Sequence, residues 1–119
     1  MIDHVGLHTQ QFDTMLAFYQ AALAPLGYTV MMQFEGNAGL GRETPDLWIS
    51  AAEGTPSRVH LALGADKHEA VDAFHAAALA AGGKDNGGPG LRPHYTPTYY
   101  AAFVIDPDGN NVEVVCHNG

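Results

Sequence analysis

Two histidines and one glutamate stand where they could bind a metal ion. His4 and His60 occupy the same register of two short apolar-alternating runs, 56 positions apart. Glu113 lies between Val112 and Val114 in a third apolar run, where a carboxylate is unusual. Imidazole nitrogen and carboxylate oxygen suit Fe(II), Mn(II), Ni(II), Co(II) or Zn(II). We therefore predict one divalent metal ion on these three residues, with positions left open for water and a chelating substrate.

Each of the three also has an ordinary structural explanation. A histidine in a strand is more often simply packed or solvated than bound to a metal. The matching registers of His4, His60 and Glu113 bring the metal site level with the structural explanation, so both stay open at this point.

A second group of side chains could carry protons. His94, Tyr95 and Tyr99 cluster just before an apolar run that begins near Tyr99. Beside a metal they would act as acid–base groups and clamp a planar ligand. Aromatic residues in front of a strand also close cores, so both explanations stay open.

Strand alternation suggests the walls of a substrate pocket. Side chains of one strand alternate between two faces, which puts His8, Trp48 and Phe103 on the faces opposite the helices. Arg42 could pair with an anionic group of a substrate, although an exposed strand arginine is the simpler explanation.

These residues need a sheet scaffold, and the apolar spacing supplies one. Period-2 patterns predict strands and period-3.6 patterns predict helices. Asp13 and Asp66 are expected to cap the two helices. The predicted order is βαβββ twice, with strands at 2–8, 28–34, 40–43, 47–50, 58–64, 99–105 and 111–116, helices at 11–26 and 66–81, and a weak strand with a long loop over 84–98.

The two halves resemble each other directly. When residues 4–27 are moved onto 60–83, nine positions match, including His4 with His60 and Phe18 with Phe74. We expect one α+β domain over 1–119, made of half-modules at about 1–54 and 57–119. In each half-module one sheet face packs on a helix, and the two free faces are expected to curl into a cleft that contains the metal.

Composition excludes several classes of protein. The formal net charge is −8, and the five basic residues are scattered, which argues against nucleic-acid or membrane binding. Cys116 is the only cysteine, so no disulfide forms within the chain. No signal peptide or apolar membrane span is visible. These features lead us to expect a cytoplasmic protein.

Four segments resemble the vicinal oxygen chelate superfamily of glyoxalases, bleomycin-resistance proteins, fosfomycin-resistance thiol transferases, methylmalonyl-CoA epimerases and extradiol dioxygenases. They are Ile2–Leu7, Phe18-Tyr19 ahead of Leu26-Gly27, Val59–Ala62 and Phe103–Glu113. The resemblance implies paired βαβββ modules and commonly a homodimer, often with modules exchanged between subunits. It also implies that His4, His60 and Glu113 are the metal ligands.

The chain departs from the glyoxalase pattern at Trp48, which stands where those enzymes carry a fourth ligand. A three-ligand set looks more like the dioxygenases or the fosfomycin enzymes, but the cations that hold a phosphonate have no clear match. We expect a divalent-metal enzyme of the lyase, isomerase or dioxygenase class that acts on a small oxygen-chelating substrate. The alternative is a non-catalytic dimer that sequesters a planar or cationic molecule, as drug-resistance proteins do.

Overall fold

The computed structural model describes residues 1–119 and contains the βαβββ order twice. The first module consists of β1 (Val5–Thr9), α1 (Phe12–Leu23), a 3-10 helix η1 (Ala24–Leu26), β2 (Thr29–Phe34), β3 (Asn37–Gly41) and β4 (Pro45–Ala51). The second consists of β5 (His60–Gly64), α2 (His68–Ala80), β6 (Lys84–Leu91), β7 (Tyr100–Ile105) and β8 (Asn111–Cys116). The predicted α+β fold of two βαβββ modules is confirmed.

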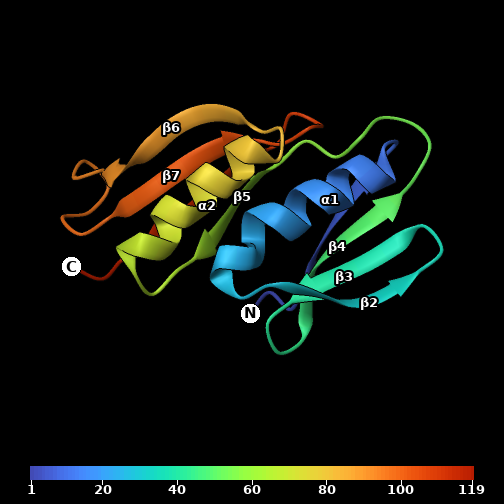
Figure 1. Cartoon of the computed structure of the whole chain (residues 1–119), viewed down its shortest axis with the longest axis horizontal. Helices are drawn as coiled ribbons and strands as arrows, with labels where there is room; N and C mark the ends of the chain where they lie inside the picture. The colour runs from blue at the N-terminus through green and yellow to red at the C-terminus, as the bar shows by residue number, and fades with distance from the viewer.

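Each module folds into one four-stranded sheet, with strand orders β1-β4-β3-β2 and β5-β8-β7-β6. The first and last strands of each module pair in parallel, and all other neighbours are antiparallel. Figure 1 shows α1 and α2 side by side in the middle of the molecule, with the two sheets extending toward opposite ends. The internal repeat of the sequence is thus a repeat of structure.

Alternation along the strands determines which sheet face meets a helix. Phe18 of α1 and Phe74 of α2 stand 56 positions apart, and both are almost completely buried. They pack in one cluster of 20 buried residues from both modules, which also includes Leu7, Leu47, Ile49, Val112, Val114 and Cys116. One apolar core therefore joins the two helices to the inner faces of both sheets.

The modules meet through their helices and not through their sheets. α1 packs on α2, and α2 also contacts η1, whereas no strand of one sheet makes comparable contact with a strand of the other. The two free faces of one chain therefore do not curl into a common cleft around His60 and Glu113, and that expectation is wrong. The reason is that burying Phe18 and Phe74 together brings the helix-covered faces inward, which leaves both free faces outside.

The helix starts also differ from prediction. The N-cap of α1 is Gln11, whose backbone N–H donates to Thr9 Oγ1 at 3.0 Å, and Asp13 lies inside the first turn. The N-cap of α2 is Lys67, and no side chain caps it. Asp13 and Asp66 are therefore not caps. Asp13 in α1 and Glu69 in α2 lie in the first turn, where an acid complements the helix dipole. None of the helices has the length and hydropathy needed to cross a membrane.

Candidate functional site

The free face of the second sheet carries the densest group of polar and aromatic side chains. Val112 and Val114 point toward α2, so Glu113 between them points away from it. The strand register sets Ala62, Glu113 and Phe103 side by side on β5, β8 and β7. These three residues therefore share one face, as alternation predicted.

Glu113 is a buried carboxylate with two side-chain partners. It is only 2% exposed. Its Oε1 lies 2.8 Å from His60 Nε2, and its Oε2 accepts a hydrogen bond from the Tyr99 hydroxyl. An ionised carboxylate away from water is costly unless it is paired or hydrogen-bonded. His60 and Tyr99 supply those bonds, and the side chain of His60 remains 53% exposed.

Tyr99 acts on Glu113 as a proton donor. Burial, followed by the hydrogen bond and the charge of Glu113, raises the pKa of Tyr99 to about 12, while the nearby positive charge of Arg92 acts in the opposite direction. The phenol therefore keeps its proton at neutral pH. In this state Tyr99 can donate a hydrogen bond or a proton, but it is a poor base.

The other two predicted proton carriers lie farther from the carboxylate. The Tyr95 ring packs edge-on against Tyr99 with centroids 5.0 Å apart, and the His94 ring lies 4.2 Å from Tyr95. Both residues are exposed. Of the three, only Tyr99 is hydrogen-bonded to Glu113, so the structure brings Tyr99 to the candidate site and leaves His94 and Tyr95 at its rim.

Phe103 and a residue missed from the sequence complete the group. The Phe103 ring lies 6.3 Å from the His60 ring. The guanidinium carbon of Arg92 lies 5.4 Å from the centroid of Phe103, an attractive cation–π arrangement. The available signal was a lone arginine two residues after a glycine-rich run, in a chain that has few cations.

His4 does not join His60 and Glu113 within one chain. It precedes β1, its side chain is 57% exposed, and its Nδ1 lies 2.7 Å from Asp3 Oδ1. No three histidine, cysteine, aspartate or glutamate side chains lie close enough together to hold an ion. One chain thus brings together two of the three predicted ligands, because β1 and β5 are edge strands of separate sheets.

The chemistry of His60 and Glu113 nevertheless fits a divalent ion. Their nitrogen and oxygen donors belong to the usual ligand set for first-row metals. His60 and Glu113 would hold such an ion through these donors. Tyr99 would stay on the second carboxylate oxygen, in the supporting role that groups around metal ligands commonly have.

The remaining predicted pocket residues belong to the first module. The Trp48 ring lies across Gly39, where a Cβ would come within 2.9 Å of it, and 6.0 Å from the Phe34 ring. His8 is exposed near the opposite end of β1 from His4, and Arg42 is exposed just after β3. Phe103 is on the other sheet, so one chain does not unite these residues in one pocket.

The largest cavity of the chain lies between the modules and has a volume of about 590 Å³. Its lining includes His4, Arg42, Ala62 and His117, but not His60, Glu113 or Tyr99. The cavity and the polar cluster therefore differ in position. We centre the candidate site on Glu113, because a buried carboxylate with converging side chains is more specific to chemistry than an open groove.

Comparisons with known proteins agree with this fold. A family model described as glyoxalase-like domain matches residues 4–115. A glyoxalase/bleomycin resistance protein from Albidiferax ferrireducens T118 is 26% identical, with a TM-score of 0.81 over 95% of both chains. A putative glyoxalase from Bacillus halodurans is 23% identical, with a TM-score of 0.74 over 98% of this chain and 95% of the other. No curated protein sequence matches the chain.

Proposed function

Because the chain belongs to the glyoxalase-like domain family, within the vicinal oxygen chelate superfamily, we propose that it is a divalent-metal-dependent enzyme. Its substrate is a small molecule that chelates the ion through its oxygens. The reaction belongs to the lyase, isomerase or dioxygenase class. His60 and Glu113 are two of the metal ligands.

One observation carries the proposal. Glu113 is 2% exposed on the free face of a sheet, in contact with His60 at 2.8 Å. Strand packing does not require a carboxylate there, since the neighbouring Ala62 and Phe103 are apolar. A polar group buried without a packing reason is a functional candidate.

The surrounding side chains have defined roles in this proposal. A bound divalent ion supplies Lewis acidity, which polarises a substrate oxygen and stabilises negative charge on it. Tyr99 orients Glu113 through its hydrogen bond and can donate a proton at the site. Phe103 forms an apolar wall beside His60 that limits the access of water.

The third ligand comes from a second copy of the chain. His4 is exposed at the start of β1, away from His60. In a homodimer that sets the free face of the first sheet of one copy against the free face of the second sheet of the other, His4 of one copy reaches His60 and Glu113 of its partner. The same arrangement puts Trp48 opposite Phe103 and forms the pocket that one chain lacks.

Metal analysis tests the ion. Protein from medium supplemented with divalent metals is expected to retain about one ion per chain, since three ligands suffice for a catalytic site. His60→Ala is expected to lose it. His75→Ala is the matched control, because His75 Nε2 makes a similar contact with Asp85, at 2.9 Å, outside the site. An absence of metal from the wild type, or equal metal in His60→Ala, would contradict the proposal.

Mixed dimers test the partner's contribution. Neither His4→Ala nor His60→Ala alone is expected to bind metal tightly. When the two variants are refolded together, each mixed dimer regains one intact site, with His4 from one copy and His60 from the other. No recovery of metal would show that the site does not form across two chains.

Ligand binding separates an enzyme from a sequestering protein. Trp48 is the only tryptophan, so its fluorescence reports on ligands near the first sheet. We expect candidate substrates to bind only in the presence of metal. Quenching that a chelator leaves unchanged, without turnover, would support the non-catalytic alternative.

A further inference from the structure

Arg92 brings a positive charge to the free face of the second sheet. Its guanidinium lies over Phe103, which is next to Glu113 across the β7–β8 pair and close to His60. The charge is close enough to Tyr99 to oppose the upward shift of its pKa. Arg92 therefore borders the group of side chains proposed to bind the metal.

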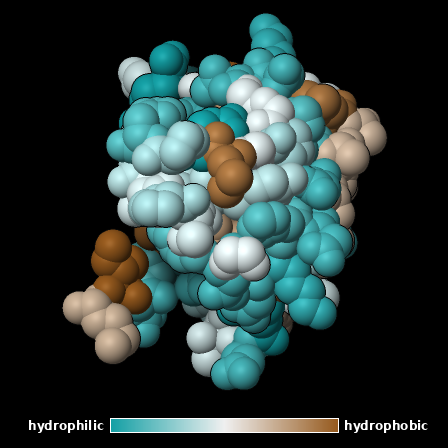
Figure 2. Space-filling model, turned by 90° about the vertical axis from the view of Figure 1, so that its left-hand side faces the viewer, coloured by the Kyte–Doolittle hydropathy of each residue, from teal (hydrophilic) through white to brown (hydrophobic).

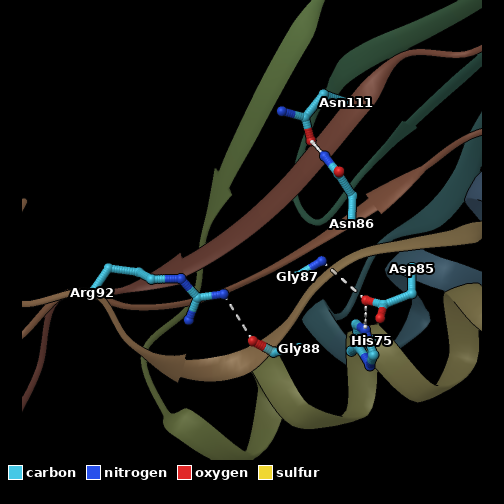
Figure 3. A network of polar contacts seen from close by, with 7 residues as sticks. All are labelled: His75, Asp85, Asn86, Gly87, Gly88, Arg92 and Asn111. Carbon is cyan, nitrogen blue, oxygen red and sulfur yellow. Dashed lines mark hydrogen bonds and ion pairs between the residues drawn. The ribbon is translucent and has the colours of Figure 1, made fainter.

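The strand before it holds this guanidinium in place. Arg92 donates hydrogen bonds to the carbonyl oxygens of Gly88 at 2.9 Å and Gly90 at 2.8 Å; Figure 3 shows the bond to Gly88. The register of β6 against β7 shifts between Gly87 and Gly90, and this bulge provides the carbonyls. A Cβ at Gly87 would come within 3.1 Å of both Arg92 and Phe103, so the glycine makes room for the arrangement.

No carboxylate neutralises Arg92. The only ion pairs in the chain involve His4, His60 and His75. A guanidinium has five N–H donors, and two carbonyls satisfy only part of that capacity. The residue is half-buried in a chain with a net charge of −8, which contains many carboxylates that could have paired with it. A fixed, partly desolvated and unpaired guanidinium is a receptor for an anion.

We propose that Arg92 binds an oxyanion of the substrate, so that the substrate class of this site is small carboxylates or phosphonates whose other end reaches His60 and Glu113. This rests on the proposed function. It assigns to Arg92 the role that sequence analysis gave to Arg42, which lines the separate cavity between the modules. The surface at this end of the molecule, seen in Figure 2, is mostly hydrophilic, which suits a polar, charged ligand.

Binding of simple anions tests the assignment. The probes are benzoate and phenylphosphonate, which separate the two oxyanion sources, and benzamide, which is similar in shape but neutral. Each is titrated into zinc-loaded and zinc-free wild-type protein and followed by NMR of the Arg92 Nε–H and of the Gly88 and Gly90 amides. At least one anion is expected to shift these signals and to bind with at least tenfold higher affinity than benzamide. Added salt is expected to weaken its binding.

Variants distinguish recognition from a purely structural role. Arg92→Gln is expected to weaken anion binding at least tenfold, and Arg92→Lys, which keeps the charge but not the fork, by less. Arg42→Gln is the matched control and is expected to change it less than twofold. A lower thermal midpoint in Arg92→Gln together with unchanged anion binding would overturn the proposal, as would equal binding of benzamide. Should Arg92→Gln fail to fold, Arg92→Lys and the benzamide comparison still decide.

Zinc content keeps this proposal separate from the one it rests on. Arg92 is not a ligand, so Arg92→Gln is expected to hold as much zinc as the wild type. Zinc binding without anion binding would overturn the role of Arg92 alone. Arg92-dependent anion binding in a protein that never binds zinc would overturn the metal enzyme, and with it the identity of the anion as a substrate group.

Discussion

The free faces of the two sheets differ most at Trp48 on β4 and Glu113 on β8. These two positions are equivalent, because Trp48 pairs with Gly6 on β1 and Glu113 pairs with Ala62 on β5, and Gly6 and Ala62 are 56 residues apart. The first module thus presents a large apolar ring where the second presents a buried carboxylate. Trp48, which stands where the resemblance places a fourth ligand in glyoxalases, is thus the structural equivalent of Glu113, a proposed ligand.

Large and small residues are exchanged around this pair. Trp48 is next to Gly39 on β3 and lies across it, whereas Glu113 is next to the large Phe103 on β7. Phe103 in turn is next to Gly87 on β6. Each sheet therefore has one aromatic ring beside one glycine. In the second sheet this pair lies on β7 and β6, one strand farther toward the edge than the equivalents of β4 and β3 in the first sheet. The first sheet offers a flat apolar platform, and the second offers a polar group beside a ring.

The inner faces of the same sheets remain alike. Phe18 and Phe74 occupy matching helix positions and are both buried, as are Ala22 and Ala78. The difference between inner and outer faces indicates that the repeat supplies a common scaffold. Chemistry depends on the few outward residues at which the copies differ, which is why the fold alone does not determine the function.

The largest expected effect tests the common scaffold. Phe18→Ala and Phe74→Ala are each expected to lower the free energy of unfolding by about 3–5 kcal/mol, since both leave a cavity in the core. Urea denaturation measures this.

The equivalent helix residues Leu23 and Leu79 are expected to differ in their effect on the free energy of unfolding. Leu23 is fully buried and Leu79 is 37% exposed, so only Leu23→Ala is expected to cost about 2–5 kcal/mol. Equal losses of unfolding free energy for the two variants would contradict the difference in burial between Leu23 and Leu79.

The next effect tests the difference between the free faces. Glu113→Gln keeps the size of the side chain but removes its charge, and is expected to lower metal affinity about a hundredfold or more, because losing a ligand costs at least as much as losing a group that supports one. Trp48→Phe at the equivalent position is expected to leave metal affinity unchanged. Isothermal titration with zinc measures both. Comparable losses in the two variants would contradict the assignment of the ion to the second sheet.

The fold could be predicted because its signals are local. Alternation and helical spacing identified the elements, and the repeat of residues 4–27 in 60–83 identified the modules. Alternation alone also put Glu113 and Phe103 on one face. The cap predictions at Asp13 and Asp66 were wrong because residue type locates a helix start only to within one or two residues, and the N-caps are Gln11 and Lys67.

The rest of the site depends on geometry that spacing cannot give. The two register shifts in β6, after Asp85 and after Gly87, break the alternation that would have located Arg92. Alternation also says nothing about which sheets face each other. It therefore could not predict whether His4 meets His60 of the same chain or of a second copy. A position in a strand predicts a face, but not the partner of that face.

A third effect compares two equivalent helix residues, Tyr19 and His75, which both contact a carboxylate. Tyr19 donates to the buried Asp106 at 2.5 Å. Burial and Asp106 raise the pKa of Tyr19 far above its ordinary value of about 10. Above pH 10 the unfolded chain therefore loses this proton while the folded chain keeps it, and the free energy of unfolding should fall by up to about 1.4 kcal/mol per pH unit. Tyr19→Phe is expected to remove this part of the slope, measured by urea denaturation at pH 9–11, whereas the exposed Tyr95→Phe is expected to keep it.

The smallest effect appears at the opposite end of the pH scale, where His75 contacts Asp85 at the surface (Figure 3). The hydrogen bond from His75, helped by the Gly87 amide, lowers the pKa of Asp85 below its ordinary value of 3.8. A carboxyl with a lowered folded-state pKa stabilises the fold above the unfolded value, and this stabilisation disappears as the pH falls through the folded value. Solvent screens so exposed a pair, so the contribution is small. Asp85→Asn is expected to make the fall in urea midpoint between pH 4.5 and 3 slightly shallower, while Glu53→Gln in the connection between modules leaves it unchanged. Tyr19 and His75 occupy equivalent helix positions. If Asp85→Asn leaves the acid slope unchanged, the contact of His75 with Asp85 does not stabilise the fold, in contrast to the buried contact of Tyr19 with Asp106.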